Sequence, residues 1–149
     1  MSLQKIILSG CLILDNKDEI LLLYRKDHQY YETPGGKVEA NECVSLENPT
    51  IPELAKAAER EAYEELGPHL KLKKLKFFAK TEFTIPDGRL AVANKFVTKI
   101  VSGKPKVNEP KTFSRLDYLP IKELEKFSLS PDLKLLLPMI KSVLSHKSA

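Results

Sequence analysis

The segment Arg60–Gly67, "REAYEELG", carries three glutamates, Glu61, Glu64 and Glu65, within little more than two turns of a helix. On an α-helix these positions are i, i+3 and i+4, so the carboxylates share one face with β-carbons about 5 to 6 Å apart. One interpretation is a solvated helix surface, on which glutamate is common. The other is a site that gathers negative charge around a cation.

The residues before this segment predict the helix to which it belongs. Thr50 and Glu53 form a capping-box pattern at the start, and Gly67 followed by Pro68 is typical of a helix end. Small and apolar residues recur at every fourth position and form a stripe that can pack on a sheet: Leu54, Ala58, Ala62 and Leu66.

Two of the glutamates flank this apolar stripe. Glu61 and Glu65 are therefore expected where the helix meets a sheet, and unpaired carboxylates are costly in such a place. A bound cation would neutralise them. Mg²⁺ takes carboxylate oxygens as ligands and typically bridges to the phosphates of a substrate, so the helix predicts phosphate chemistry.

Four apolar runs predict strands. Lys5–Leu14 and Glu19–Lys26 are separated by the turn sequence "DNKD", which predicts a hairpin. Leu75–Ile85 and Arg89–Val101 flank "PDG", which predicts a second hairpin. With one helix between the two hairpins, the order of elements indicates an α/β protein.

Length and composition limit the class of protein. The chain has 149 residues, 42% hydrophobic and 30% charged, which fits a single domain with a sizeable core. No apolar run reaches the roughly 20 residues of a membrane span, and the start of the sequence lacks a secretory signal, so we expect neither membrane insertion nor export.

Cysteine content and charge indicate the compartment and the partners. Cys11 and Cys43 match neither a metal-ligand spacing nor a disulfide framework, so we expect a reducing, cytoplasmic location. A net charge of +4 is compatible with an anionic ligand but too small to indicate polymeric nucleic acid. We expect a monomer or homodimer that binds a small ligand.

The sequence upstream of the helix contains a glycine pair, in "TPGGKVEANE". Gly35 and Gly36 allow the main chain to approach a ligand closely, although such a pair alone is more typical of a plain turn. Five residues separate Gly36 from Glu42, and the acidic helix follows. The spacing of these residues resembles the signature of the Nudix (MutT-like) hydrolases, G-x5-E-x7-R-E-U-x-E-E-x-G-U, in which U is apolar. The matching residues are Gly36, Glu42, Arg60, Glu61, Ala62, Glu64, Glu65 and Gly67, with Pro68 in the last U place.

The match departs from the signature at one point. Seventeen residues, 43 to 59, separate Glu42 from Arg60, where the family has seven. The box at 36–68 therefore contains an insertion of about ten residues near 45–54, which we expect to lengthen the loop before the helix, to leave the acidic face in register and to rim the substrate pocket.

The resemblance implies a fold and a domain organisation. The family fold is an α/β/α sandwich with a mixed β-sheet, so residues 1–149 are expected to form a single Nudix hydrolase domain. The tail "LSPDLKLLLPMIKSVL" would supply the second helix, in which Pro138 predicts a kink or break near Lys134–Pro138.

The resemblance also implies an enzyme and its site. Family members hydrolyse a nucleoside diphosphate linked to another group, through attack of water on phosphorus. The metal ligands for Mg²⁺ or Mn²⁺ would be Gly35, through its carbonyl, with Glu61, Glu64 and Glu65. The catalytic residues would be Glu61 as the base, Arg60 as a group that orients carboxylates through ion pairs with Glu61 or Glu42, and Glu109 as a base or ligand.

Residues that contact the substrate are less specifically indicated. Gly36, Glu42 and Arg25 are the candidates, although Arg25 and Lys26 also suit the exposed end of a strand. Single aromatic residues are more often part of a core than a platform for a base. Those near the predicted strand ends are Tyr30, Tyr31, Phe83 and Phe113.

Three functions stay open at this point. We expect a nucleoside triphosphate pyrophosphohydrolase, which includes enzymes that act on oxidised nucleotides. The second function is the same chemistry on ADP-ribose, a nucleoside diphosphate sugar or a dinucleoside polyphosphate. The third is a nucleotide-binding module without catalysis, although such a module has no need of three clustered carboxylates.

Overall fold

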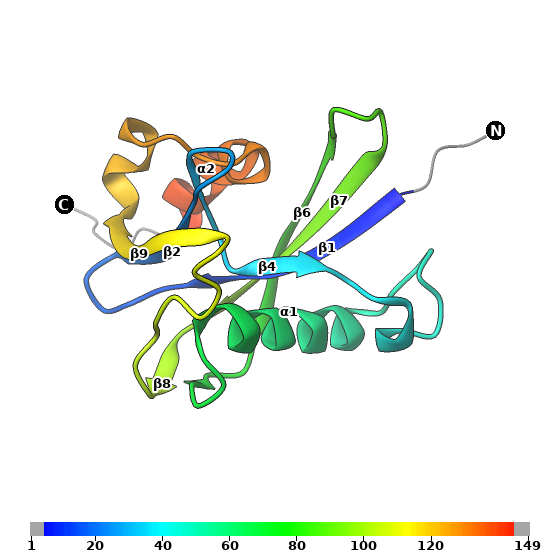
Figure 1. Ribbon diagram of the computed structural model, residues 1–149, viewed down its shortest axis with the longest axis horizontal. Helices are drawn as coiled ribbons and strands as arrows, with labels where there is room; N and C mark the ends of the chain where they lie inside the picture. The colour runs from blue at the N-terminus through cyan, green and yellow to red at the C-terminus, as the bar shows by residue number, and fades with distance from the viewer. Residues whose placement is uncertain (1–4, 145–149) are drawn as a thin grey trace.

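The computed structural model describes residues 5–144, in which two helices cover a central mixed sheet (Figure 1). The order of strands in this sheet is β4-β1-β7-β6. Strands β1 and β7 are parallel, and the other two pairs are antiparallel. The bounds are Lys5–Ile13 for β1, Gly35–Lys37 for β4, Lys76–Thr84 for β6 and Leu90–Thr98 for β7. The predicted α/β class and mixed sheet are confirmed.

Two smaller sheets flank the central one. The three-stranded sheet has the order β3-β2-β9, and strands β5 and β8 form a two-stranded ribbon. The bounds are Glu19–Arg25 for β2, Tyr30–Glu32 for β3, Lys71–Leu72 for β5, Ile100–Ser102 for β8 and Phe113–Pro120 for β9.

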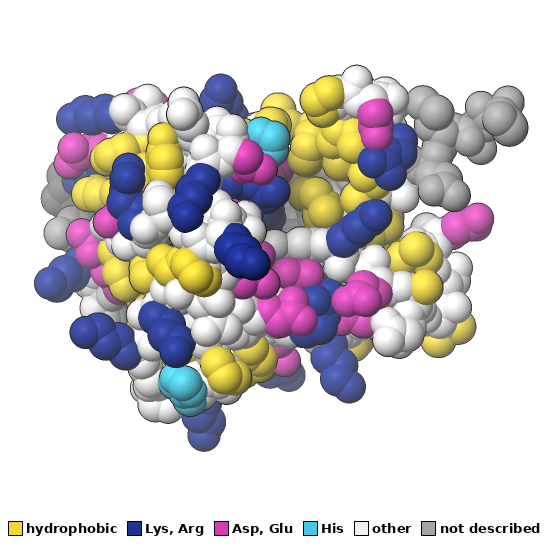
Figure 2. All heavy atoms as spheres, in the orientation of Figure 1, with side chains coloured by type: hydrophobic (Ala, Val, Ile, Leu, Met, Phe, Trp, Pro, Cys, Tyr) yellow, Lys and Arg dark blue, Asp and Glu magenta, His cyan; other side chains and the backbone are white. Residues whose placement is uncertain are grey.

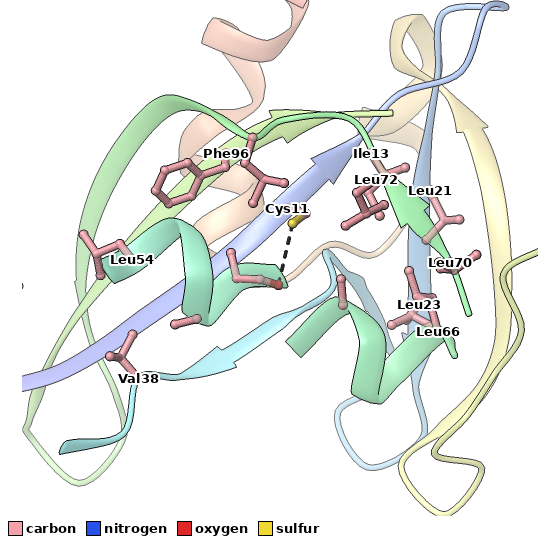
Figure 3. Close-up of a cluster of buried hydrophobic side chains, with 14 of the residues drawn as sticks. Cys11, Ile13, Leu21, Leu23, Val38, Leu54, Leu66, Leu70, Leu72 and Phe96 are labelled. Carbon is pink, nitrogen blue, oxygen red and sulfur yellow. Dashed lines mark hydrogen bonds between the residues drawn. The ribbon is translucent and has the colours of Figure 1, made fainter. Parts of the chain in front are cut away.

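Each of the two α-helices packs into its own cluster of buried apolar side chains. Helix α1, Ile51–Leu66, packs on the central sheet through its buried stripe, and Figure 3 shows Leu54 and Leu66 of this helix in the same cluster as Cys11 and Phe96 of the sheet. Helix α2, Pro131–Leu144, contributes four buried side chains to a second cluster, which also includes residues of β1, β2 and β6. Short 3₁₀ helices occur at Ala40–Glu42 (η1) and Ile121–Lys126 (η2). Neither helix of the described residues has the length and apolar character needed to cross a membrane.

The predicted first hairpin is wrong. A turn does join β1 to β2, with Asp15 accepting hydrogen bonds from the backbone N–H groups of Lys17 and Glu19, both at 2.9 Å. However, only one antiparallel bridge, Leu14 to Ile20, links the two segments, and the strands then enter different sheets. Each is an inner strand of its sheet, β1 between β4 and β7 and β2 between β3 and β9, so each finds two partners elsewhere.

The second hairpin is confirmed. Strands β6 and β7 pair antiparallel across the "PDG" turn, in which Gly88 has a φ of 93° that suits glycine.

The predicted break in the last helix is absent, because α2 continues through Pro138. Proline removes one backbone hydrogen bond, whose acceptor would be the carbonyl of Lys134. Both Pro138 and Lys134 are exposed, so water can satisfy that carbonyl, while Leu136 and Ile140 anchor the opposite face in the core.

The segment 43–50, which contains most of the insertion, forms a loop before α1. The side chain of Glu53 holds both of its ends, since its carboxylate accepts from the backbone N–H of Val44 at 3.0 Å and of Thr50 at 2.9 Å. The side chain of Val44 and that of Leu46, which lies between these points, are exposed. The insertion therefore lengthens a surface loop, as expected.

Candidate active site

Helix α1 begins and ends as the sequence predicts. The hydroxyl of Thr50 accepts from the N–H of Glu53 at 3.3 Å, and the N–H of Gly67 donates to the carbonyl of Tyr63 at 3.0 Å. The predicted apolar stripe is buried. Because the stripe faces the sheet, it sets the rotation of the helix and so fixes where the three glutamates lie.

The glycine pair lies directly against two of these glutamates. The N–H of Gly35 donates to Oε1 of Glu65 at 3.0 Å. At Gly36, a β-carbon would lie only 2.6 Å from the carboxylate atoms of Glu61. Gly10 of β1, which the sequence analysis missed, has a similar role, because a β-carbon there would lie 2.5 Å from the carbonyl oxygen of Pro34. Glycine at these positions lets β4 lie close to both β1 and the acidic helix.

Arg60 joins the acidic residues into one network. Its guanidinium donates twice to Glu42, at 2.6 and 2.9 Å, and also contacts Glu61 at 3.0 Å and Glu64 at 2.9 Å. Both predicted ion pairs of Arg60 are thus present, and the insertion leaves Glu42 within reach. The hydrogen bond from Arg60 lowers the pKa of Glu42 and raises the pKa of Arg60 itself.

Burial raises the pKa of the two inner glutamates. Glu65 is 5% exposed, and desolvation raises its pKa to about 9, to which the nearby charges of Glu61, Glu32 and Glu109 contribute. Desolvation also raises the pKa of Glu61, against the opposing effect of Arg60. Both groups lie in a place with an excess of negative charge, which a cation would relieve.

The loop before β9 brings Glu109 near this cluster. Asn108 anchors the loop to the end of α1, with its N–H on the carbonyl of Glu65 and its side-chain amide on the carbonyl of Glu64, both at 2.9 Å. Asn108 was missed by the sequence analysis. Glu109 itself is exposed and contributes to the raised pKa of Glu61 and Glu65.

The carboxylates share a surface but do not form a closed ligand set. Figure 2 shows acidic side chains gathered over α1 and β4, with basic side chains among them. Within residues 5–144, no three His, Cys, Asp or Glu side chains are spaced to hold a metal ion. Instead, Arg60 pairs with Glu61 and Glu64, while the N–H of Gly35 donates to Glu65. The donors are nevertheless oxygens, as a hard divalent ion requires.

A cleft of about 500 Å³ opens beside the glycine pair. Of the predicted site residues, it is lined by Arg25, Gly35 and Gly36, and of the aromatic candidates by Tyr30 and Phe83. Glu42 is not among the lining residues and faces Arg60 instead, so its predicted contact with substrate gains no support. Arg25 contacts Asp27 at 2.8 Å and Glu32 at 3.5 Å.

The other two aromatic candidates and the insertion lie outside the cleft. Tyr31 and Phe113 are buried in the core. None of residues 45–54 lines the cleft, so the expectation that the insertion rims it is wrong. The physical reason is that the loop is held at the N-terminal end of α1, whereas the cleft adjoins Gly35 and Gly36 of β4.

Sequence analysis missed the polar floor of the cleft. Lys95 of β7 donates to the hydroxyl of Thr33 at 2.6 Å and lies 2.7 Å from Asp132, which also accepts from Ser130 at 2.8 Å. The available signal was a lysine within the largely apolar run "LAVANKFV". Its partners come from segments far apart in the sequence, so no motif marked them.

Comparisons with known proteins agree with this architecture. The family model described as the NUDIX domain matches residues 7–140. None of the curated proteins matches the sequence. A MutT NUDIX hydrolase from Burkholderia pseudomallei superposes with a TM-score of 0.74 at 24% identity, covering 92% of this chain and 98% of that one.

Two further solved structures are similar. A MutT protein from Methanosarcina mazei Go1 has a TM-score of 0.73 at 19% identity, with 95% of this chain and 96% of that one covered. A bifunctional NMN adenylyltransferase/ADP ribose pyrophosphatase from Francisella tularensis has a TM-score of 0.63 at 20% identity, with 97% of this chain and 43% of that one covered. At these identities the likeness supports the fold.

Proposed function

The chain belongs to the family of Nudix hydrolases, and from this premise we propose that it cleaves the pyrophosphate linkage of a nucleoside triphosphate, releasing pyrophosphate and a nucleoside monophosphate. One observation carries the proposal. The glutamates of α1 lie against the glycine pair Gly35–Gly36, and the same pair lines a cleft of about 500 Å³. Acidic groups and a space for a nucleoside therefore adjoin one another.

We propose that the oxygens of Glu61, Glu64 and Glu65, with the carbonyl of Gly35, hold Mg²⁺ or Mn²⁺. The raised pKa of Glu65 and of Glu61 supports this assignment, because burial disfavours the charged form of both groups and a bound cation would stabilise that form. Divalent ions at such a site neutralise phosphoryl charge and lower the pKa of bound water.

The chain's own residues would orient the reaction. The N–H of Gly35 fixes the carboxylate of Glu65, and Arg60 holds Glu61 at 3.0 Å. Glu61, next to Gly36 and half-buried, is our candidate to accept the proton of the attacking water, with Glu109 as the alternative. The arginine would act by positioning these carboxylates.

The second candidate function is hydrolysis of ADP-ribose or a related diphosphate. The similar structure from Francisella tularensis is a bifunctional protein that carries an ADP ribose pyrophosphatase, which keeps this substrate class open. The compact cleft favours a ligand with one nucleoside. Both cysteines are free thiols, in keeping with our proposal of a cytoplasmic protein.

A turnover assay over a nucleotide panel with Mg²⁺ tests the proposal. Pyrophosphate with a monophosphate from triphosphates supports it, while AMP with ribose 5-phosphate from ADP-ribose supports the second candidate. If no compound is turned over, the remaining candidate is a nucleotide-binding module without catalysis. Glu65→Gln should lower the rate by orders of magnitude, and Glu59→Gln on the same helix is the matched control.

A further inference from the structure

Lys95 is a buried cation with unused hydrogen-bonding capacity. Its side chain is 6% exposed, although it lines the cleft. An ammonium group carries three N–H donors. Within residues 5–144, two of them are used, one by Thr33 at 2.6 Å and one by Asp132 at 2.7 Å. One donor is left for a ligand in the cleft.

Asp132 provides an acceptor next to this donor. It accepts from Lys95 through one oxygen and from Ser130 through the other, and a carboxylate has lone pairs for further donors. Although burial opposes ionisation, the ammonium of Lys95 and the hydrogen bonds keep the pKa of Asp132 below its ordinary value. The floor of the cleft thus offers an N–H donor and a carboxylate acceptor side by side.

The other walls of the cleft suit a flat ring. Apolar side chains line one part of it: Leu8, Phe83, Ile85 and Pro86. His28 and Tyr30 stack on each other at the rim, with ring centroids 5.2 Å apart. A planar heterocycle can bury its faces against such walls only if the polar atoms on its edge find partners.

We propose that Lys95 and Asp132 select nucleobases with a lactam edge, that is, a ring carbonyl beside a ring N–H. These are the 6-oxopurines and the 4-oxopyrimidines. The carbonyl accepts from Lys95, and the adjacent N–H donates to Asp132. Adenine and cytosine place an amino group where the carbonyl would be, so in the same position they direct a donor at the buried ammonium. This inference rests on the proposed function only in taking the ligand to be a nucleotide.

Two pairs of monophosphates isolate the lactam edge. IMP and AMP share their phosphate and ribose and differ at the edge of the purine, and UMP and CMP differ in the same way. We expect calorimetric titration without added metal to show IMP binding at least tenfold more tightly than AMP, and UMP at least tenfold more tightly than CMP. A hydrogen bond to a buried charged group has an effect of about this size.

A neutral pair of substitutions tests the residues. Lys95→Gln with Asp132→Asn replaces the ion pair by amides that can still bond to each other, and we expect both affinity ratios to fall to about threefold or less. Lys80→Gln, at an exposed position of β6, is the control and should keep the wild-type ratios. Thermal unfolding shows whether the variants fold.

Several results would overturn the inference: wild-type ratios near one, ratios that persist in a folded double variant, or no measurable binding of IMP and UMP. If the double variant does not fold, the wild-type ratios alone decide. Failure of the proposed function is distinguishable, because it appears as absent turnover of every triphosphate. If turnover depends on Glu65 but does not differ between nucleotides with and without a lactam edge, the proposed function stands and the proposed role of Lys95 is rejected.

Discussion

Replacing Glu65 by glutamine should make the protein without metal more stable while it removes activity. The pKa of Glu65 is raised from 4.5 to about 9 in the folded chain, so folding at pH 7 requires the uptake of a proton. Each pH unit above the unfolded pKa costs about 1.4 kcal/mol, and pH 7 lies about 2.5 units above it. Glutamine avoids this cost of about 3 kcal/mol and can still accept the hydrogen bond of Gly35.

The sign of the pH dependence follows from the same raised pKa. Because folded Glu65 binds a proton that the unfolded chain releases, the free energy of unfolding of the wild type should fall as pH rises from 4.5 towards about 9. The glutamine variant lacks this component. The advantage of the variant should therefore shrink to about 1 kcal/mol or less at pH 5.

Urea unfolding in the presence of a chelator, at pH 5, 7 and 8, measures both effects. Glu59→Gln is the control on the same helix, and its change should stay within about 0.5 kcal/mol. The reasoning is refuted if Glu65→Gln is less stable than the wild type at pH 7, or if the two stability curves run parallel. Rates with Mg²⁺ should fall by orders of magnitude in Glu65→Gln, since it loses a charged ligand.

Three further predictions concern the neighbouring residues. Gly36→Ala meets only a flexible carboxylate, so we expect a stability change of about 1 kcal/mol or less with a rate at least tenfold lower, whereas Gly35→Ala meets the backbone of β1 and should lose about 2 kcal/mol. Thermal unfolding and initial rates measure both, and equal destabilisation would contradict the distinction. A double-mutant cycle of Arg60→Gln and Glu42→Gln should give a coupling of about 1 to 2 kcal/mol in unfolding free energy, because the pair is bidentate; additive effects would show no coupling. Because metal-bound water loses its proton more readily as pH rises, the rate should climb between about pH 6 and 9, and Glu109→Gln should flatten this rise without changing the Mg²⁺ requirement if Glu109 is the base; a variant like the wild type would exclude Glu109 from the site and leave Glu61 as the base.

The acidic helix could be predicted because its determinants are local. Capping by Thr50, the stop at Gly67 and the four-residue stripe all lie within one segment, and each acts over a single turn or two. The second hairpin was predictable for the same reason, since its turn joins adjacent strands. The pairing of Arg60 with Glu42 followed from the family spacing once the insertion was placed in the loop.

Features that depend on long-range pairing could not be predicted in this way. The turn between β1 and β2 has good local signals, yet partners from distant segments separate the two strands. The cleft floor has the same property, since Thr33, Lys95 and Asp132 meet only after the sheets and α2 have assembled. The acidic cluster on the helix could therefore be predicted from one contiguous segment, whereas the cleft is lined by residues from many segments.

The carboxylate of Glu53 closes the loop 43–50 at its base, and this has a consequence for protein engineering. Val44 and Thr50 are both held by one side chain that belongs to the helix, so the ends of the loop are fixed independently of the residues between them. The entropy of closing a loop changes slowly with its length, so segments of different size can be spliced in there at little cost. Because none of residues 43–50 lines the cleft, we expect an epitope or reporter peptide placed between Val44 and Thr50 to project into solvent and to label the enzyme with little effect on its catalysis.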